Sequence, residues 1–484
     1  MLLVMLGQLF PASLLLLSSA KTNSVTTPST ISKSWGAYTP YFAVGAYEPP
    51  PKQCVIEQAH ILERHGARFP TSGSGASIKE AIEKLQKPAT YNDPRMKFLK
   101  NFTYSLGVAD LVPFGALQCV LYYSFDHPTV MVIGLDYRGR SSTIATENFS
   151  ALTTYPLYEP RVDSEWWTVR RIGPLVRRLS GFPVLMKSLM KHAGFSAASQ
   201  DIYKPTLNVV LSEAGNDTLD DNGCPNAGSS DTQTAAWLSI FAPSITKRLN
   251  AGAPGANLVD SDTYALIAMC AFHTVATAQG SNLTLSPFCD LFDKGDFMDF
   301  EYAMDLDKYY GTGYGAFLGR VQGVGYINEL ISRLTSTPVN DSTQTNTTLT
   351  SNPETFPLNR TIYADFSHDN QIIAIFTAMG LFRQQKALDP TSRTAESGRT
   401  WLASHLVPFS ARMTVERLLC GPKEHKTKSV RIFVNDELQP LEFCAGSNAD
   451  KQMTRAGICK LERFLESQSY ARNGGEGEWD ECFT

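Results

Sequence analysis

The stretch at residues 55–70 reads VIEQAHILERHGARFP and contains both an apolar run and a cluster of charged residues. Its first half, Val55 to Leu62, is rich in apolar residues and predicts a β-strand, although apolar and polar positions do not alternate strictly. The loop from Glu63 to Gly75 follows. Ser77 and Glu80 then have the spacing of a capping box, and apolar residues recur behind them at helical spacing. The stretch therefore predicts a strand, a loop and a helix in succession.

The same order of elements recurs far downstream. Thr361 to Phe366 predicts a strand, Ser367 to Asn370 a short turn, and Gln371 to Leu381 a helix with one apolar face. In open α/β sheets, ligands bind at the polar loops that follow the carboxyl ends of strands. Both loops carry histidine, so they are the candidate ligand-binding loops of the chain.

The remaining segments add helices and a hairpin. Helical patterns cover residues 231–250, 261–277 and 326–334, and the first two predict a mainly helical insertion between the two units. Val430 to Leu441 predicts a β-hairpin. The glycine-rich tail at 474–477 is expected to be flexible unless Cys482 anchors it.

The segment Arg64-His65-Gly66-Ala67-Arg68 places one imidazole between two guanidinium groups. Guanidinium groups offer paired planar donors that match phosphate oxygens. A neutral imidazole can attack phosphorus and form a covalent intermediate, while fixed cations stabilise the charge on the phosphoryl oxygens. In the second loop, Asp369 is the candidate general acid for the leaving alkoxide, and His368 is a candidate hydrogen-bonding partner of bound phosphate.

Each loop also has a simpler interpretation. The first one, taken alone, fits a solvated surface loop with an incidental histidine. His368 and Asp369, taken alone, fit a helix N-terminus, because Asp and Asn routinely cap helices. The presence of both motifs, each placed between a strand and a helix, favours the catalytic interpretation.

The composition is typical of a soluble globular protein without a nucleic-acid partner. Of 484 residues, 43% are hydrophobic and 19% charged, and the formal net charge is −4 at pH 7. In acid, many of the 47 carboxylates would be protonated while the 43 Lys and Arg residues stay charged. The chain would then be cationic and would attract a polyanionic substrate.

The N-terminal segment MLLVMLGQLFPASLLLLSSA predicts a secretory signal peptide cleaved near Ala20, because an apolar run ends there in small residues. No basic residue precedes the run, and an N-terminal membrane anchor is the alternative. Pro11 and the shortness of the run argue against an anchor, since a span needs about 20 apolar residues. We therefore expect a secreted, extracellular protein without stable membrane association once the signal is removed.

Two further features agree with secretion. Candidate N-glycosylation sites of the form N-x-S/T occur at Asn101, Asn148, Asn216, Asn282, Asn340, Asn346 and Asn359. The chain has nine cysteines, of which eight can form four disulfides, and their spacing alone fixes no pairing. None of the cysteines or histidines has the spacing of a zinc site.

The two motifs RHGARFP at 64–70 and SHDN at 367–370 resemble those of the histidine acid phosphatase family. A lone RHG also occurs in phosphoglycerate mutases, but the pair in this order behind a secretory leader is much more specific. The resemblance covers roughly residues 35–120 and 195–484. Further segments resemble the fungal phytases within the family: DLVPFGALQ at 110–118, LSPFCDLF at 285–292, KYYGTGYG at 308–315, QGVGY at 322–326, FPLNRTIYADFSHDN at 356–370 and WDECF at 479–483.

The resemblance implies roles for the matching positions. His65 would be the nucleophile and Asp369 the proton donor, while Arg64, Arg68 and His368 would bind phosphate. No metal or other cofactor is needed. The resemblance also implies disulfides Cys54–Cys420, Cys224–Cys482, Cys270–Cys289 and Cys444–Cys459, which leaves Cys119 as a thiol.

The family fold implies a large α/β domain with a smaller, mainly α-helical domain inserted and the site between them. On this basis we expect a signal peptide at 1–20, a flexible leader at 21–34, the α/β catalytic domain at 35–195 and 300–484, and the mainly helical domain at 196–299.

Residues 120–194 depart from the family pattern. There the resemblance requires a strand, an Arg-x-Ser-Gly-like turn with a third phosphate-binding arginine, and a helix. The segment PLVRRLSG at 174–181 partly resembles the start of this pattern, but no arginine stands near Pro183, where it is expected. Arg177 or Arg178 is the candidate substitute. Such a bounded loss resembles a retained intron or a frame change in the gene, or it is real divergence.

The leading hypothesis is a secreted, monomeric acid phosphomonoesterase that hydrolyses phytate (inositol hexakisphosphate) through a phosphohistidine. One alternative is a broad-specificity acid phosphatase. Another is a secreted homologue whose catalysis is lost or impaired by the segment at 120–194. A mutase-type phosphoryl transferase fits poorly with the leader and the cysteines.

Overall fold

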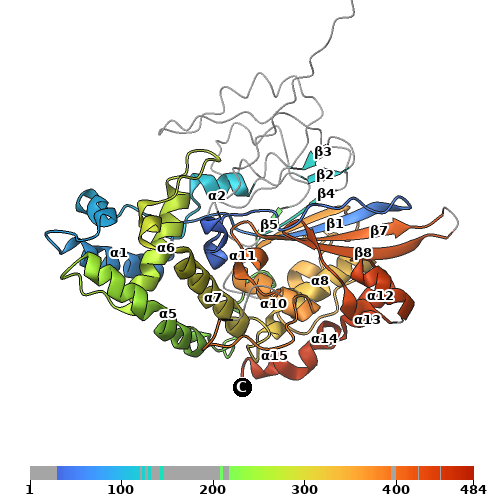
Figure 1. Ribbon diagram of the computed structural model, residues 1–484. Helices are drawn as coiled ribbons and strands as arrows, with labels where there is room; N and C mark the ends of the chain where they lie inside the picture. Colours follow the sequence, from blue (N-terminus) through green and yellow to red (C-terminus); the bar gives the residue numbers. More distant parts are fainter. Residues whose placement is uncertain are drawn as a thin grey trace, which may run out of the picture.

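The computed structural model describes residues 30–119, 123–125, 129–131, 142–146, 208–210, 217–393, 399–422, 425–446 and 448–484. A mixed β-sheet forms the centre of the described part of the molecule, and its strands run in the order β10-β8-β7-β1-β6-β4-β5, with β9 beside β8. Figure 1 shows helices gathered at one end of the sheet and against one of its faces. The predicted α/β class is confirmed.

The strands and helices have the following bounds. The strands are β1 (Cys54–Arg64), β2 (Tyr123–Phe125), β3 (Thr129–Met131), β4 (Ser142–Thr146), β5 (Asn208–Val210), β6 (Ile362–Ser367), β7 (Arg412–Cys420), β8 (Thr427–Val434), β9 (Glu437–Leu438) and β10 (Cys459–Lys460). The helices are α1 (Ser72–Gln86), α2 (Pro113–Gln118), α5 (Asp231–Gly252), α6 (Asp260–Ala276), α7 (Lys294–Gly311), α8 (Val324–Thr335), α9 (Thr347–Thr350), α10 (Asp369–Met379), α11 (Ala403–Leu406), α12 (Asn448–Arg455), α13 (Leu461–Ser467), α14 (Ser469–Arg472) and α15 (Glu478–Glu481).

Strand β1 is central to the sheet and positions the site. It runs parallel to β6, with Arg64 opposite Ser367, and antiparallel to β7. Because the carboxyl ends of parallel strands lie at the same edge, the two histidine-bearing loops leave the sheet side by side. From Gln58 to Arg64 every residue of β1 is buried. Burial on both faces explains why the sequence of this strand shows no strict alternation.

The helical part of the molecule packs at one end of the sheet. Helix α6 contacts α1 and α5, and α5 also contacts α7 (Figure 1). The helices α5 and α6 occupy the two segments that the sequence predicts as helical between the catalytic motifs. Their apolar residues join those of the sheet in one continuous core.

Helices α1 and α10 begin earlier than the sequence analysis predicts. Helix α1 begins at Ser72, because the Thr71 side chain accepts a hydrogen bond from the backbone N–H of Ser74 and caps the helix there. The proposed cap at Ser77 is therefore wrong, and the Ser77 hydroxyl donates to a carbonyl inside the helix. Helix α10 begins at Asp369, since His368 has an extended backbone and forms the N-cap position. The turn between β6 and α10 is thus shorter than expected.

The C-terminal part of the chain forms one side of the sheet, with β10 at its edge. The predicted hairpin is present as β8 and β9, and Asn435 and Asp436 at its turn both have positive φ, as the tight hairpin turns between twisted strands require. The tail forms short helices that end at Cys482, which is bonded to Cys224. The four disulfides are the pairs that the family resemblance implies: Cys54–Cys420, Cys224–Cys482, Cys270–Cys289 and Cys444–Cys459.

Several sequence predictions fall on residues outside the described ranges. They are the signal peptide, most of the leader at 21–34, Arg177, Arg178, and the sequons at Asn148 and Asn216. Of the other candidate glycosylation sites, Asn101, Asn282, Asn340 and Asn359 are exposed and Asn346 is partly buried. Among the helices of the described residues, none has the length and apolar character needed to cross a membrane.

Candidate active site

The loop after β1 is fixed on both sides by backbone hydrogen bonds. The N–H of His65 donates to the carbonyl oxygen of Ser367 at 3.2 Å, which ties the first loop to the second. The carbonyl oxygen of His65 accepts from the N–H of Ser410 at 2.9 Å. Both histidine-bearing loops therefore share one hydrogen-bonded framework with the segment that precedes β7.

Glycine is required where this loop crosses α2. A Cβ on Gly66 would lie 2.1 Å from the carbonyl oxygen of Gly115, and a Cβ on Gly115 would lie 1.8 Å from that of Ala67. The N–H of Gly66 donates to the thiol sulfur of Cys119 at 3.1 Å, and that of Ala67 to the Gln118 side chain at 3.0 Å. The backbone of the first loop is thus packed directly onto the end of α2.

The His65 side chain is buried and has a defined tautomer. Its Nδ1 lies 2.9 Å from the carbonyl oxygen of Gly66. A carbonyl can only accept, so Nδ1 carries the proton and Nε2 keeps its lone pair. The pKa of His65 is well below its ordinary 6.5, because burial and the nearby charges of Arg64 and Arg68 disfavour the imidazolium. The surroundings therefore favour the neutral imidazole, whose unprotonated Nε2 lies toward Arg68.

Arg64 is almost wholly buried and held by backbone carbonyls. Its Nη1 donates to the oxygens of Ala37 and Val407 at 2.5 and 2.6 Å. Its guanidinium carbon lies 4.9 Å from the centre of the Phe409 ring, and its Nη2 lies 3.3 Å from a carboxylate oxygen of Asp369. Burial lowers the pKa of Arg64 to about 10, so the side chain stays cationic in acid.

Arg68 and His368 complete the surroundings of the His65 ring. The Nε of Arg68 lies 3.3 Å from Nε2 of His65 and donates to it. The ring of His368 lies 5.7 Å from that of His65, measured between centroids. The structure therefore brings all five predicted residues of the two loops together, and Nε2 of His65 faces the cationic side chain that the sequence assigned to phosphate.

Asp369 lies between two cations. Its carboxylate is 2.8 Å from Nζ of Lys308 and 3.3 Å from Nη2 of Arg64. Burial alone would raise the pKa of Asp369, but the charges of Arg64 and Lys308 outweigh it and hold the pKa well below the ordinary 3.8. Asp369 is thus ionised while no phosphate is bound.

Lys308 is a site residue that sequence reasoning did not single out. It is buried on α7, and its Nζ contacts the carboxylates of Asp307 and Asp369 and donates to the Asn370 side chain at 2.6 Å. Although burial opposes its charge, the carboxylates raise the pKa of Lys308 above the ordinary value. Its one signal in the sequence is the KYYGTGYG segment, since nothing in the local pattern indicates that α7 passes beside the SHDN turn.

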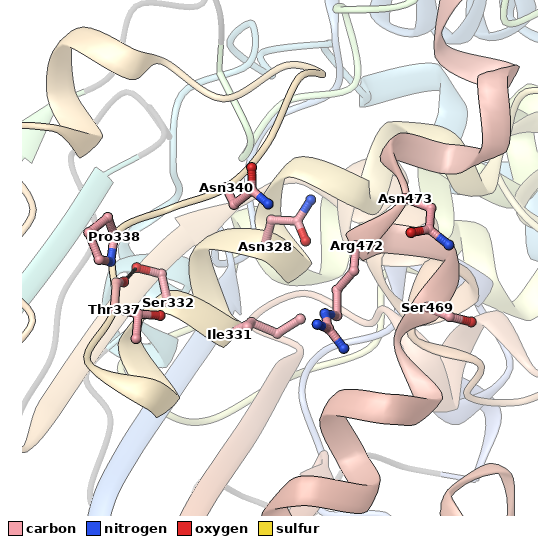
Figure 2. A pocket seen from close by; sticks show the side chains of 9 residues that line it. All are labelled: Asn328, Ile331, Ser332, Thr337, Pro338, Asn340, Ser469, Arg472 and Asn473. Atoms are coloured by element: carbon pink, nitrogen blue, oxygen red, sulfur yellow. Dashed lines mark hydrogen bonds between the residues drawn. The ribbon is translucent and has the colours of Figure 1, made fainter.

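Two further features of the described chain concern metal ions and a pocket. Within the described ranges, no three His, Cys, Asp or Glu side chains gather as a metal ion would need. Figure 2 shows a pocket of about 490 Å³ between α8, the loop after it and α14, lined by Asn328, Ile331, Ser332, Thr337, Pro338, Asn340, Ser469, Arg472 and Asn473. None of the predicted catalytic residues lines it.

Comparison with known proteins gives the family. The model of the histidine phosphatase superfamily, branch 2, matches residues 55–120 and 185–435. The unmatched stretch between the two ranges lies within the segment that departs from the family pattern in the sequence. The match includes both histidine-bearing loops.

Curated relatives match over nearly the whole chain. Phytase A of Aspergillus terreus is 38% identical over 471 residues, covering 94% of this chain and 91% of that protein. Phytase A of Aspergillus oryzae is 36% identical over 473 residues, with the same two coverages. Among solved structures, the phytase from D. castellii superposes with a TM-score of 0.57 at 20% identity, covering 91% of this chain and 85% of that one, and so shares its fold. By sequence and fold, the chain belongs to branch 2 of the histidine phosphatase superfamily.

Proposed function

We propose that this chain is a phytase, a phosphoric monoester hydrolase that works through a phosphohistidine on His65. The observation that carries the proposal is the state of His65. Its ring is neutral in acid, its Nδ1 proton is held by the Gly66 carbonyl, and its Nε2 faces Arg68. This is the arrangement that nucleophilic attack on a phosphate monoester requires.

In the first step, Nε2 of His65 attacks phosphorus, the P–N bond forms and the bond to the ester oxygen breaks. Arg64, Arg68 and His368 hold the phosphoryl oxygens, where the charge of the transition state resides. The departing alkoxide takes a proton from Asp369 and leaves as an alcohol.

The position of Asp369 suggests how it acquires that proton. In the absence of phosphate, Arg64 and Lys308 both contact its carboxylate and keep it ionised. A bound phosphoryl group competes for the same two cations, which raises the pKa of Asp369 toward the working pH. A phosphate monoester has a second pKa of about 6 and arrives protonated in acid, so it brings the proton that Asp369 then holds.

In the second step, water attacks the phosphohistidine on the side that the alcohol has left. Asp369, now a carboxylate, accepts a proton from the water, the P–N bond breaks and neutral His65 is regenerated. Asp369 then passes the proton to the departing inorganic phosphate and is again ionised. Atoms and charges balance without any group beyond the ester and water.

Phytate is the proposed substrate because the curated relatives are named Phytase A. Its several phosphate groups suit a chain that becomes cationic in acid. A broad-specificity acid phosphatase is the second candidate, since the residues of the described site are those proposed to hold a single phosphoryl group. Rates on phytate and on a small aryl phosphate distinguish the two.

Secretion and the domain bounds are part of the proposal. Four disulfides and exposed sequons such as Asn101 and Asn282 support an extracellular protein. We also propose the division into an α/β domain at 35–195 and 300–484 and a helical domain at 196–299, which agrees with the grouping of α5 and α6 apart from the sheet. A monomeric state remains a prediction.

The test is phosphate release from phytate at about pH 5 by wild type, His65→Ala and His425→Ala. His425 is exposed and far from the two loops in the sequence, so its variant is the matched control. We expect the rate of phosphate release to fall at least about 1,000-fold in His65→Ala and to stay unchanged in His425→Ala. After rapid quenching, wild type should carry an acid-labile phosphate. Turnover by His65→Ala would refute the proposal. Inactive wild type would favour a homologue impaired by residues 120–194.

A further inference from the structure

The Arg64 guanidinium depends on two short segments that do not belong to either catalytic loop. Nη1 uses both of its N–H groups on the carbonyls of Ala37 and Val407. Ala37 lies in the short 3-10 helix η2 (Gly36–Tyr38), and Val407 follows α11. With Nη1 fixed in this way, only Nη2 and Nε can be offered to an anion, so the two carbonyls decide where Arg64 points.

Both segments are held by a single carboxylate on α7. One oxygen of Glu301 accepts from the N–H of Gly36 at 2.5 Å, and the other accepts from the N–H of Ser404 at 2.9 Å. Glu301 is 2% exposed, and burial raises its pKa. Figure 1 shows α11 beside α7, and η2 contacts both helices, so one carboxylate on α7 bonds to both segments.

The surrounding packing leaves little freedom to replace these bonds. Gly36 has a positive φ of 55°, and a Cβ there would lie 2.4 Å from Met304 on α7. On the other side, Asp305 accepts from the N–H of Ala403 at 2.6 Å and pairs with Arg399. The backbone of η2 and of α11 thus approaches α7 closely, with buried carboxylates at the points of contact.

We propose that Glu301 is a positioning residue for phosphate binding: it fixes the two segments whose carbonyls aim Arg64 at the phosphoryl group. The inference rests on the proposed function of Arg64. Glu301 acts through the peptide groups of Gly36 and Ser404 and through the Ser404 side chain, and it is not among the residues proposed to contact phosphate. It lies outside the RHGARFP and SHDN motifs, so only the folded chain reveals it.

The experiment measures inorganic phosphate binding, both as inhibition of 4-nitrophenyl phosphate hydrolysis and directly by calorimetry. In Glu301→Gln, one N–H loses its acceptor because the amide nitrogen only donates. We expect phosphate affinity to fall about tenfold, the size of a lost charge-assisted hydrogen bond, and KM to rise in parallel. The thermal midpoint reports stability separately.

Asp262→Asn is the matched control. Asp262 is also a buried carboxylate that accepts a backbone N–H, that of Val259, but it pairs with Lys84 and not with the segments around Arg64. This variant should lose stability and keep the phosphate affinity of wild type. A folded Glu301→Gln with unchanged phosphate affinity would overturn the proposal.

Two further variants show whether a loss of affinity comes from misfolding or from an effect that does not pass through Arg64. Glu301→Asp keeps the charge but is one methylene too short to reach both N–H groups, and the same loss of affinity is expected. In an Arg64→Lys background, Glu301→Gln should add little, because residues that act through one another are non-additive. Full additivity would contradict the inference. Phytate turnover, measured alongside, tests the proposed function independently of phosphate affinity.

Discussion

A histidine with the ordinary pKa of 6.5 would be mostly protonated at pH 5 and would have no lone pair to offer phosphorus. In this chain, burial and the neighbouring arginines lower the pKa of His65 well below that value. The arginines proposed to bind the phosphoryl group therefore also favour the neutral form of the proposed nucleophile. Acid conditions that protonate Asp369 in the complex leave His65 competent, which explains how one site contains a base and an acid at the same pH.

Lys308 should set the pH range of the proton donor. In Lys308→Met, Asp369 loses the cation 2.8 Å from its carboxylate, so its pKa rises. We expect the alkaline limb of kcat to move to higher pH, and the maximal rate to fall by about 10- to 100-fold because a phosphate-facing cation is lost. Profiles of kcat on an aryl phosphate measure both. Lys79→Met, an exposed lysine on α1, is the control, and an unshifted limb in Lys308→Met would count against this role.

Glu329 should make the protein less stable as the pH rises. Burial raises its pKa from 4.5 to about 8, and its carboxyl accepts from Thr218. A folded-state pKa above the unfolded value contributes stability that is full below pH 4.5 and is lost as the pH rises through 8. Glu329→Gln keeps an acceptor for Thr218 and does not titrate.

Urea unfolding at pH 5 and pH 8 measures this contribution. From pH 5 to pH 8, the free energy of unfolding of wild type should fall by on the order of 3 kcal/mol more than that of Glu329→Gln. Equal losses in the two proteins would show that Glu329 is ionised in the folded state across this range.

At the scale of elements, the sequence predicts the strands of the two units well and their helix starts poorly. β1 and β6 are marked by dense apolar runs before polar loops, and both lie where expected. The start of α1 depends on whether Thr71 or Ser77 caps it, and both residues are suitable caps. The packing of the segment in the folded chain decides which residue caps the helix, and the local sequence does not encode that packing.

Packing of the first loop against α2 should make Gly66 irreplaceable. In Gly66→Ala, the new Cβ would overlap the Gly115 carbonyl, which is backbone and cannot move aside. We expect a loss of about 2–3 kcal/mol in stability and of most activity. In Gly73→Ala on α1, the Cβ meets nothing within 4 Å, so stability should be unchanged or rise by up to about 1 kcal/mol. Thermal unfolding and turnover compare the two, and a fully active Gly66→Ala would contradict the close approach.

In the folded molecule as a whole, the residues of the site differ in how well the sequence alone predicts them. His65, Arg64 and Arg68 are adjacent in the chain, and so are His368 and Asp369, so each group forms a recognisable motif. Lys308 and Glu301 reach the site only because α7 crosses beside α10 and α11. No local spacing encodes that crossing. Arg177, proposed from a partial resemblance, lies outside the described residues.

The disulfides should differ in their contribution to stability. Cys54–Cys420 joins residues 366 apart and Cys270–Cys289 residues 19 apart. In the chain-entropy account, replacing the first pair by serines should destabilise the protein by about 2–3 kcal/mol more than replacing the second. Thermal midpoints of the two double variants check this. A larger loss from the Cys270–Cys289 pair would show that packing dominates over chain entropy.

The pairing of β1 with β6 also sets when the molecule can first act. His65 leaves the ribosome about 300 residues before His368, an interval on the order of half a minute at the usual rate of synthesis. Until β6 pairs with β1, His65 has neither Asp369, its proposed proton donor, nor the backbone contact to Ser367. The nascent chain is therefore inactive during most of its translation. The time at which activity appears shows when β6 has paired with β1.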